Sequence, residues 1–247
     1  SVSKDGKTWT TLNNKQPYLT SNVGTQGVRD PYILRGEDGK FFIIATDLSV
    51  YNLKNNWTAA AQQGSKSIVV WESSDLVNWS EASLVKINND NAGCTWAPEA
   101  CYDPEKDEYM VFWASVVSDD SYQKYRIYRS YTKDFKTFSA PELYIEEPNA
   151  VIDTTIIDHE GTYYRFTKNE AKSSITMQEC TSLSGDWKDV ASYNLGSMTG
   201  YEGPTIYKLN GKNEWCLLLD YFSKSKGYKP FVTTDITKGE FTADSDF

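Results

Sequence analysis

Glu202-Gly203-Pro204-Thr205-Ile206 places a carboxylate at the start of an apolar, β-branched run, and three further stretches of the chain do nearly the same. They are Arg29-Asp30-Pro31-Tyr32-Ile33, Trp96-Ala97-Pro98-Glu99-Ala100 and Ile152-Asp153-Thr154-Thr155-Ile156. Core packing is a poor explanation for this repetition, because acidic side chains are almost never fully buried without a partner. A fold that directs the starts of its strands at one central cavity would gather these acids into a single site.

The rest of the chain is patterned for β-structure. Short runs such as Phe41-Phe42-Ile43-Ile44-Ala45 and Tyr109-Met110-Val111-Phe112-Trp113 are rich in β-branched and aromatic residues. Turn dipeptides separate the runs, as at Glu160-Gly161 and Asn210-Gly211. Because no long amphipathic helical pattern stands out, we expect an all-β protein.

A second motif also recurs, and it combines Ser or Thr, a short turn that usually carries Asp, and an aromatic residue. Its five copies are Ser3–Trp9, Ser73–Trp79, Thr132–Phe138, Thr181–Trp187 and Thr233–Phe241. With the acid-led strands between them, the unit reads as strand, hairpin, strand, link, strand, turn, strand. A four-stranded antiparallel unit repeated at roughly 50–70 residues is typical of propeller blades. A β-sandwich is the rival interpretation, but it would not explain the repeated order of motifs.

The number of copies predicts a five-bladed β-propeller with one incomplete blade. Five outer motifs accompany only four acid-led strands, and the first outer motif occupies residues 1–10 with nothing before it. In closed propellers the two termini commonly share a blade, so we expect the shared blade to lack strands in this chain. We interpret residues 1–247 as a single propeller domain.

Composition limits the classes of partner. The formal net charge is −9, which argues against nucleic acid or an anionic membrane surface. No apolar run reaches the 18 residues of a membrane-spanning helix, and no charged and apolar leader opens the chain, so any signal peptide is absent or already removed. The spacing of Cys94, Cys101, Cys180 and Cys216 matches no zinc pattern, and either a Cys94–Cys101 disulfide or four free thiols is compatible with it.

Three of the acids suit glycoside hydrolysis. When the inner strands are aligned on their first apolar residues, Asp30, Asp153 and Glu202 fall at similar opening positions, whereas Glu99 follows its proline and is shifted in register. One ionised acid could activate a water, one protonated acid could donate to the leaving oxygen, and the third could raise the pKa of that donor through like-charge repulsion. Turn capping or pairing with Lys and Arg is the alternative role for any single acid.

The ordered blocks Arg29-Asp30-Pro31, Trp96-Ala97-Pro98-Glu99, Ile152–Ile156 and Glu202–Ile206 resemble the signature blocks of glycoside hydrolase family 43. Trp71–Trp79 also resembles a blade-edge segment of that family, and the resemblance extends from about Ser3 to Phe241. The family comprises five-bladed propellers that include arabinofuranosidases, β-xylosidases, endo-arabinanases and galactan-acting enzymes.

The resemblance implies catalytic roles for three residues. It makes Asp30 the general base, Glu202 the general acid and Asp153 the acid that tunes and positions Glu202. It also implies inversion at the anomeric carbon, for which the base and acid carboxyl groups should lie about 6.5–9.5 Å apart.

Trp96, Glu99 and Arg29 are the candidate substrate-binding residues. Trp96 could serve as a sugar platform or pack between blades. Arg29 could contact substrate, although its position next to Asp30 on a strand favours a structural role. Glu99 is the least secure member of the set because of its shifted register.

The resemblance breaks down at the closing blade. In many members that segment brings a histidine to the central channel, often beside a bound cation, but His159 lies in the turn Asp158-His159-Glu160-Gly161 and does not match. We therefore expect His159 to be an exposed turn residue, no metal ligands and no required cofactor, with a structural calcium in the central channel in doubt.

We expect an inverting glycoside hydrolase that removes α-L-arabinofuranose or β-D-xylose from oligosaccharides or polysaccharides. The alternatives are a galactofuranose- or galactan-acting member of the same family and a non-catalytic carbohydrate-binding propeller. The expected partner is a saccharide, with no nucleic acid or membrane partner, and the expected location is secreted or periplasmic. Nothing in the sequence decides the oligomeric state.

Overall fold

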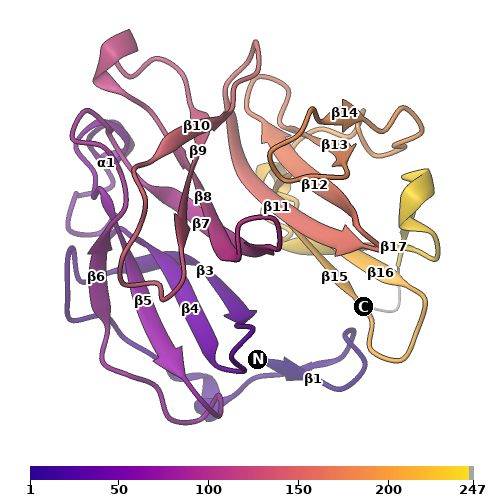
Figure 1. Cartoon of the computed structure of the whole chain (residues 1–247), viewed down its shortest axis with the longest axis horizontal. Helices are drawn as coiled ribbons and strands as arrows, with labels where there is room; N and C mark the ends of the chain where they lie inside the picture. Colours follow the sequence, from indigo (N-terminus) through magenta and orange to yellow (C-terminus); the bar gives the residue numbers. More distant parts are fainter. Residues whose placement is uncertain (245–247) are drawn as a thin grey trace. The chain divides into compact units, whose positions relative to one another are not determined.

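The computed structural model describes residues 1–244, and the regular secondary structure of these residues is almost entirely β (Figure 1). Four sheets have four strands each, and within each sheet the strands are neighbours in chain order. The all-β class and the repeated four-stranded blade unit predicted from the sequence are therefore confirmed.

The bounds of the strands follow the expected repeat. The first sheet contains β3 (Val28–Arg35), β4 (Phe41–Asp47), β5 (Ser67–Ser73) and β6 (Ser83–Lys86). The second contains β7 (Trp96–Asp103), β8 (Glu108–Ser115), β9 (Arg126–Thr132) and β10 (Glu142–Ile145). The third contains β11 (Val151–His159), β12 (Thr162–Asn169), β13 (Ser174–Cys180) and β14 (Lys188–Asp189). The fourth contains β15 (Glu202–Lys208), β16 (Trp215–Asp220), β17 (Tyr228–Thr233) and β18 (Thr242–Ala243).

Few other elements are present in the described part of the chain. One α-helix, α1 (Trp57–Gln62), lies between β4 and β5. Four 3₁₀ turns occur at Asn13–Lys15, Ser118–Asp120, Phe222–Lys224 and Ile236–Lys238. Among residues 1–244, no helix is long and apolar enough to cross a membrane.

The chain divides into two compact units, which are described separately below. The middle unit is Thr20–Ile152 and holds the first two sheets. The split unit joins Ser1–Leu19 with Asp153–Phe247 and holds the last two sheets. Each unit has its own apolar core.

In the middle unit, Phe135 joins the two sheets. Its side chain is fully buried, and its ring stacks on Phe42 of β4 with centroids 4.4 Å apart. The same ring lies 5.0 Å from that of Tyr109 in β8. Phe135 belongs to the turn of the outer motif Thr132–Phe138, so this motif contributes directly to the core between neighbouring sheets.

The core of the split unit is built around large side chains from all of its longer strands. Phe166 of β12 and Trp215 of β16 are almost completely buried and pack with Phe231 and Phe241. His159, the last residue of β11, lies against this core. The centroid of its ring is 4.7 Å from that of Trp215. The expectation of an exposed turn residue is therefore wrong, because His159 is half-buried.

Asp75 and Asp134 show what the Asp of an outer motif does. Asp75 accepts hydrogen bonds from the backbone N–H groups of Val77 and Asn78, and Asp134 accepts from those of Lys136 and Thr137. Such Asx turns satisfy the amide groups of a tight connection between two strands. These hydrogen bonds lower the pKa of Asp75 to about 2, because they stabilise the ionised carboxylate. The donors are the backbone amide of Asn78, the Asn78 side chain and the backbone amide of Val77.

The first outer motif forms a two-stranded sheet of β1 (Val2–Ser3) and β2 (Trp9–Thr10). It is anchored within the split unit, since the hydroxyl of Tyr207 donates to the carbonyl of Gly6 at 2.8 Å and Lys7 pairs with Asp244. The ring of Trp9 packs edge-on against Tyr207. Residues 1–244 thus form four complete blades and this additional pair of strands, and a complete fifth blade is not formed by them.

The four cysteines are free thiols, which decides between the two alternatives left by their spacing. Cys94 and Cys216 are buried, while Cys101 and Cys180 are partly exposed. Burial raises the pKa of Cys94 to about 12, so its thiol is a neutral, space-filling group at physiological pH.

Replacing Phe135 tests whether the outer motif holds the middle unit together. We expect Phe135→Ala to lower the free energy of unfolding by about 3–5 kcal/mol, because it removes a fully buried ring and leaves a cavity. Urea unfolding followed by tryptophan fluorescence measures the change. Leu76→Ala is the matched control. Leu76 follows the Asp of its own motif and has the same left-handed backbone, but it is 41% exposed. Its replacement should therefore change the free energy of unfolding by less than about 1 kcal/mol. Equal effects of the two substitutions would contradict the role of Phe135.

Candidate active site

Each inner strand opens with one residue in the left-handed backbone region. These residues are Asp30, Ala97, Asp153 and Gly203, with φ between 47° and 54°. In three of the sheets the strand register also gains one residue at this point, between Arg29 and Tyr32, between Trp96 and Glu99, and between Glu202 and Thr205. An extra residue with left-handed backbone is a β-bulge, which bends the strand and redirects the neighbouring side chains.

The bulge corrects the alignment of the acids predicted from the sequence. Asp30 and Asp153 both occupy the left-handed position, but in the fourth sheet that position is Gly203, so Glu202 lies one residue earlier. Glu99 lies two residues after the left-handed Ala97, which confirms its shifted register. The sequence alignment placed Glu202 wrongly because a one-residue bulge cannot be recognised from apolar alternation.

In the middle unit, Asp30 is held by a threonine of the next strand. The hydroxyl of Thr46 donates to Oδ2 of Asp30 at 2.9 Å and accepts from the backbone N–H of Ala97 at 2.8 Å. Thr46 is buried in β4, so its position is fixed by the sheet. This single hydroxyl therefore links the openings of β3 and β7, while Asp30 itself is exposed.

An aromatic cluster lies beside Asp30 in the same unit. Trp96 stacks on Tyr125 with ring centroids 5.5 Å apart, and Trp57 meets Trp96 edge-on at 6.2 Å. The guanidinium carbon of Arg29 lies 5.3 Å above the ring of Trp57. Arg29 thus makes a cation–π contact, and its role stays a prediction. Trp57 stands at the start of α1, where the side chain of Asn56 caps the helix, and it is 49% exposed.

Glu99 packs toward the interior of the middle unit. Burial, together with the negative charges of Glu99 and Cys101, raises the pKa of the Tyr32 hydroxyl well above its usual range. Tyr32 and Glu99 are equivalent residues of neighbouring inner strands, each two positions after the bulge.

In the split unit, the structure brings Asp153 and Glu202 together. The backbone N–H of Gly203 donates to Oδ2 of Asp153 at 3.1 Å, so the carboxylate of Asp153 is bound to the peptide group that follows Glu202. A buried hydrogen bond of 3.0 Å between Thr154 and Thr167 fixes the start of β11 against β12. Two of the three predicted catalytic acids therefore form one hydrogen-bonded frame.

Lys168 completes this frame. Its ammonium lies 2.8 Å from Oε2 of Glu202 and 2.6 Å from Glu170, and its side chain is 5% exposed. Burial acts to lower the pKa of Lys168, but the hydrogen bonds and negative charges of Glu170 and Glu202 outweigh burial and raise it, so the lysine stays charged. Opposite Glu202 in the strand register is Asp220, whose pKa is raised by burial and by the charge of Glu202.

Sequence reasoning missed several members of these two clusters. Thr46, Trp57, Tyr125, Glu170 and Asp220 carry no local motif, and each reaches its place through pairing with a distant strand or through packing. Lys168 follows the hairpin after Asp153, but strand alternation alone could not decide which face it occupies. Asp30 belongs to the middle unit and the other two acids to the split unit, so the carboxyl separation required for inversion stays a prediction.

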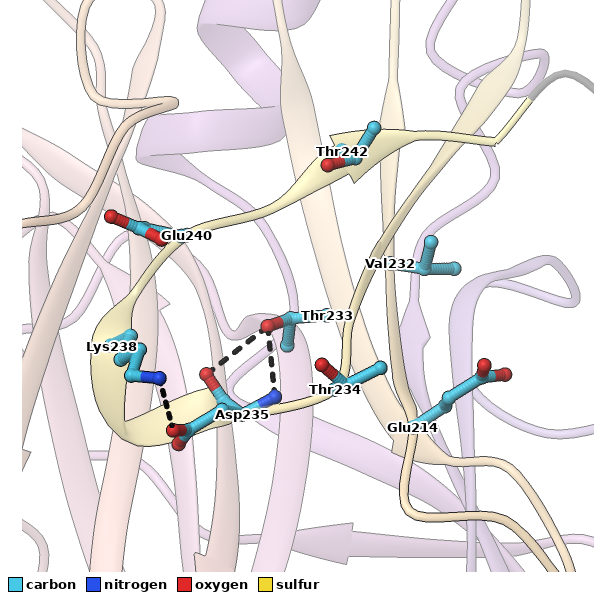
Figure 2. A pocket seen from close by; sticks show the side chains of 8 residues that line it. All are labelled: Glu214, Val232, Thr233, Thr234, Asp235, Lys238, Glu240 and Thr242. Carbon is cyan, nitrogen blue, oxygen red and sulfur yellow. Dashed lines mark hydrogen bonds and ion pairs between the residues drawn. The ribbon is translucent and has the colours of Figure 1, made fainter.

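A separate hollow of about 330 Å³ lies on the outer strands of the fourth sheet (Figure 2). It is lined by Glu214, Val232, Thr233, Thr234, Asp235, Lys238, Glu240 and Thr242. Asp235 is committed to local contacts, since it pairs with Lys238 at 3.2 Å and its backbone exchanges hydrogen bonds with Thr233. The hollow contains none of the candidate catalytic or substrate-binding residues, and much of its lining belongs to the outer motif Thr233–Phe241.

Metal ligands are not clustered in the described part of the chain. Among residues 1–244, no group of three or more His, Cys, Asp or Glu side chains is arranged to hold a metal ion.

Comparison with known proteins places the chain in a family. A family model described as a probable glycosyl hydrolase domain, related to glycoside hydrolase family 43, matches residues 1–247. The chain belongs to this family.

A curated family relative and two solved structures are similar to this probable glycosyl hydrolase domain. An alpha-L-arabinofuranosidase of Bifidobacterium longum subsp. longum is 32% identical, and the match covers 96% of this chain but 26% of the relative. The domain thus spans about a quarter of that protein's length.

The solved structures support the fold. A thermostable family-43 glycoside hydrolase is 20% identical with a TM-score of 0.63, and the match covers 89% of this chain and 72% of that one. The catalytic domain of a GH62 alpha-L-arabinofuranosidase from Coprinopsis cinerea is 16% identical with a TM-score of 0.62, and the match covers 90% and 69% of the two chains.

Proposed function

We propose that this chain is the catalytic domain of an inverting glycoside hydrolase that removes α-L-arabinofuranose from oligosaccharides or polysaccharides, with β-D-xylose as the second candidate sugar. The observation that carries the proposal is a pair of hydrogen bonds. The backbone N–H of Gly203 donates to Asp153, and the ammonium of Lys168 donates to Glu202. A family of probable glycosyl hydrolases and a relative named alpha-L-arabinofuranosidase support the choice of reaction and sugar.

The proposed chemistry assigns one step to each acid. Ionised Asp30 takes a proton from a water molecule, whose oxygen attacks the anomeric carbon. The bond from that carbon to the glycosidic oxygen breaks, and protonated Glu202 gives its proton to the leaving oxygen. Asp153 positions Glu202 through Gly203 N–H.

The proposal also covers cofactors and location. Two carboxyl groups and a water are sufficient for hydrolysis, so we expect no cofactor, and no metal ligand is assigned. We expect a secreted or periplasmic enzyme, because its proposed saccharide substrates lie outside the cytoplasm.

Removing either proposed catalytic acid should stop hydrolysis. We expect Asp30→Asn and Glu202→Gln to lower kcat/KM on an arabino-oligosaccharide by about 100-fold or more, since general acid–base groups typically contribute that much. Asp90→Asn is the control, because its side chain is 91% exposed and pairs with Lys86 at the surface. Wild-type turnover in either acid variant would overturn the assignment.

A substrate panel tests the sugar. Release of nitrophenol from the α-L-arabinofuranoside should exceed release from the β-xyloside and the β-galactofuranoside. A preference for the galactofuranoside would favour the galactan-acting alternative, and calorimetric binding without turnover on any substrate would favour a carbohydrate-binding propeller.

Product stereochemistry tests the proposed inversion. Proton NMR recorded during the first turnovers on an α-L-arabinofuranoside should show the β-anomer of free arabinose before mutarotation, because the water attacks from the face opposite the leaving group. Initial formation of the α-anomer would contradict inversion and the wide separation of the two carboxyl groups.

The aromatic cluster of the middle unit is the proposed saccharide platform. We expect Trp57→Ala and Trp96→Ala to raise KM for an arabino-oligosaccharide by about tenfold with little change in kcat, since losing a stacking surface removes about 0.5–1.5 kcal/mol beyond buried area. Trp9→Ala is the matched control, because Trp9 is similarly exposed, at 47%, but belongs to the N-terminal hairpin. A loss confined to kcat would argue against a binding role.

A further inference from the structure

Lys168 is an unusual residue for the interior of a β-sheet. Its side chain is 5% exposed, and lysine is almost never buried to that extent unless it is paired. Its two partners come from different elements, since Glu170 follows β12 and Glu202 opens β15. The ring of Phe222 lies 4.7 Å from the ammonium and covers it.

The geometry fixes one oxygen of the proposed general acid. Lys168 donates to Oε2 of Glu202 at 2.8 Å. Among the described residues, this is the hydrogen bond made by the side chain of Glu202. Oε1 therefore stays available to carry a proton toward a leaving group. Because Glu170 holds the same ammonium at 2.6 Å, the lysine is fixed from both sides and cannot follow Glu202 if that side chain rotates.

One ammonium and three further carboxyl groups surround Glu202. The groups that face it are Lys168, Glu170 beyond the lysine, Asp220 across the strand pair, and Asp153 through Gly203 N–H. Lys168 contacts two of these carboxyl groups, those of Glu170 and Glu202. Burial and the charge of Glu202 raise the pKa of Asp220.

We propose that Lys168 is a positioning residue for the general acid: clamped between Glu170 and Glu202, it holds the carboxyl group of Glu202 in the orientation that protonates the leaving oxygen. The proposal rests on the proposed function of Glu202. It differs from a purely structural buried ion pair, which would stabilise the fold without affecting proton transfer.

The leaving group distinguishes these two roles. A sugar alcohol or an unsubstituted phenol departs as a strong base and needs the acid's proton, whereas dinitrophenol departs readily without it. A residue that acts through the general acid therefore affects only the first class of substrate. A residue that merely supports the fold affects both classes alike.

The test compares kcat/KM on phenyl and 2,5-dinitrophenyl α-L-arabinofuranosides. We expect Lys168→Met to lower kcat/KM on the phenyl substrate by about tenfold or more, which is a part of the roughly 100-fold or larger contribution of a general acid. On the dinitrophenyl substrate, kcat/KM should stay within about twofold of the wild type. Lys168→Arg keeps the charge and should fall between Lys168→Met and the wild type. Lys212→Met is the control, because Lys212 pairs loosely with Glu214 at 3.7 Å in the hairpin between β15 and β16.

Glu202→Gln, measured in the same way, separates failure of the inference from failure of the proposed function. If Glu202→Gln shows the leaving-group dependence and Lys168→Met does not, the inference is overturned and the function stands. If Glu202→Gln shows none, the acid assignment fails, and the inference fails with it. An equal loss on both substrates in Lys168→Met, with an unchanged melting temperature, would also overturn the inference.

Glu170→Gln keeps the test decisive if Lys168→Met does not fold. The side chain of Glu170 is 34% exposed, so its replacement should leave the fold intact. Without its second anchor, Lys168 should hold Glu202 less firmly, and we expect the same leaving-group dependence at about threefold, a smaller part of the general-acid contribution. A wild-type ratio between the two substrates in this variant would overturn the clamp.

Discussion

The left-handed residue at the opening of each inner strand is the constraint on which the site depends. An L-residue in this region costs about 1–2 kcal/mol, and the surrounding sheet must supply that free energy. Asp30 and Asp153 occupy this position themselves, whereas Glu202 precedes a glycine that occupies it. The same left-handed backbone position therefore presents these acids in two different ways.

Within each unit, a polar contact also links two neighbouring strand openings. Thr46 connects Asp30 to the Ala97 amide, and Asp153 receives the Gly203 amide. Both contacts satisfy a backbone N–H exposed by the bulge, so the same hydrogen bond that stabilises the irregular backbone also orients a carboxylate. Stability and positioning of the acids are therefore difficult to change independently.

The sequence was sufficient to predict the blades, because turn chemistry and strand composition are local. Asp75 and Asp134 mark outer turns through contacts with residues two and three positions away, and such contacts are visible in the linear pattern. The alignment of Glu202 was off by one residue, because a bulge changes register without changing composition. Thr46, Trp57 and Lys168 could not be assigned, since their partners lie on other strands or loops and depend on packing.

The N-terminal hairpin has a consequence for how the chain folds. Gly6 is bound by Tyr207, 201 residues later, and Lys7 by Asp244, 237 residues later. During synthesis the hairpin leaves the ribosome long before these partners, so its docking cannot be completed until Asp244 has been made. Contacts of such high sequence separation are slow to form, and the split unit is consequently the part of the protein that must wait longest as an incomplete structure.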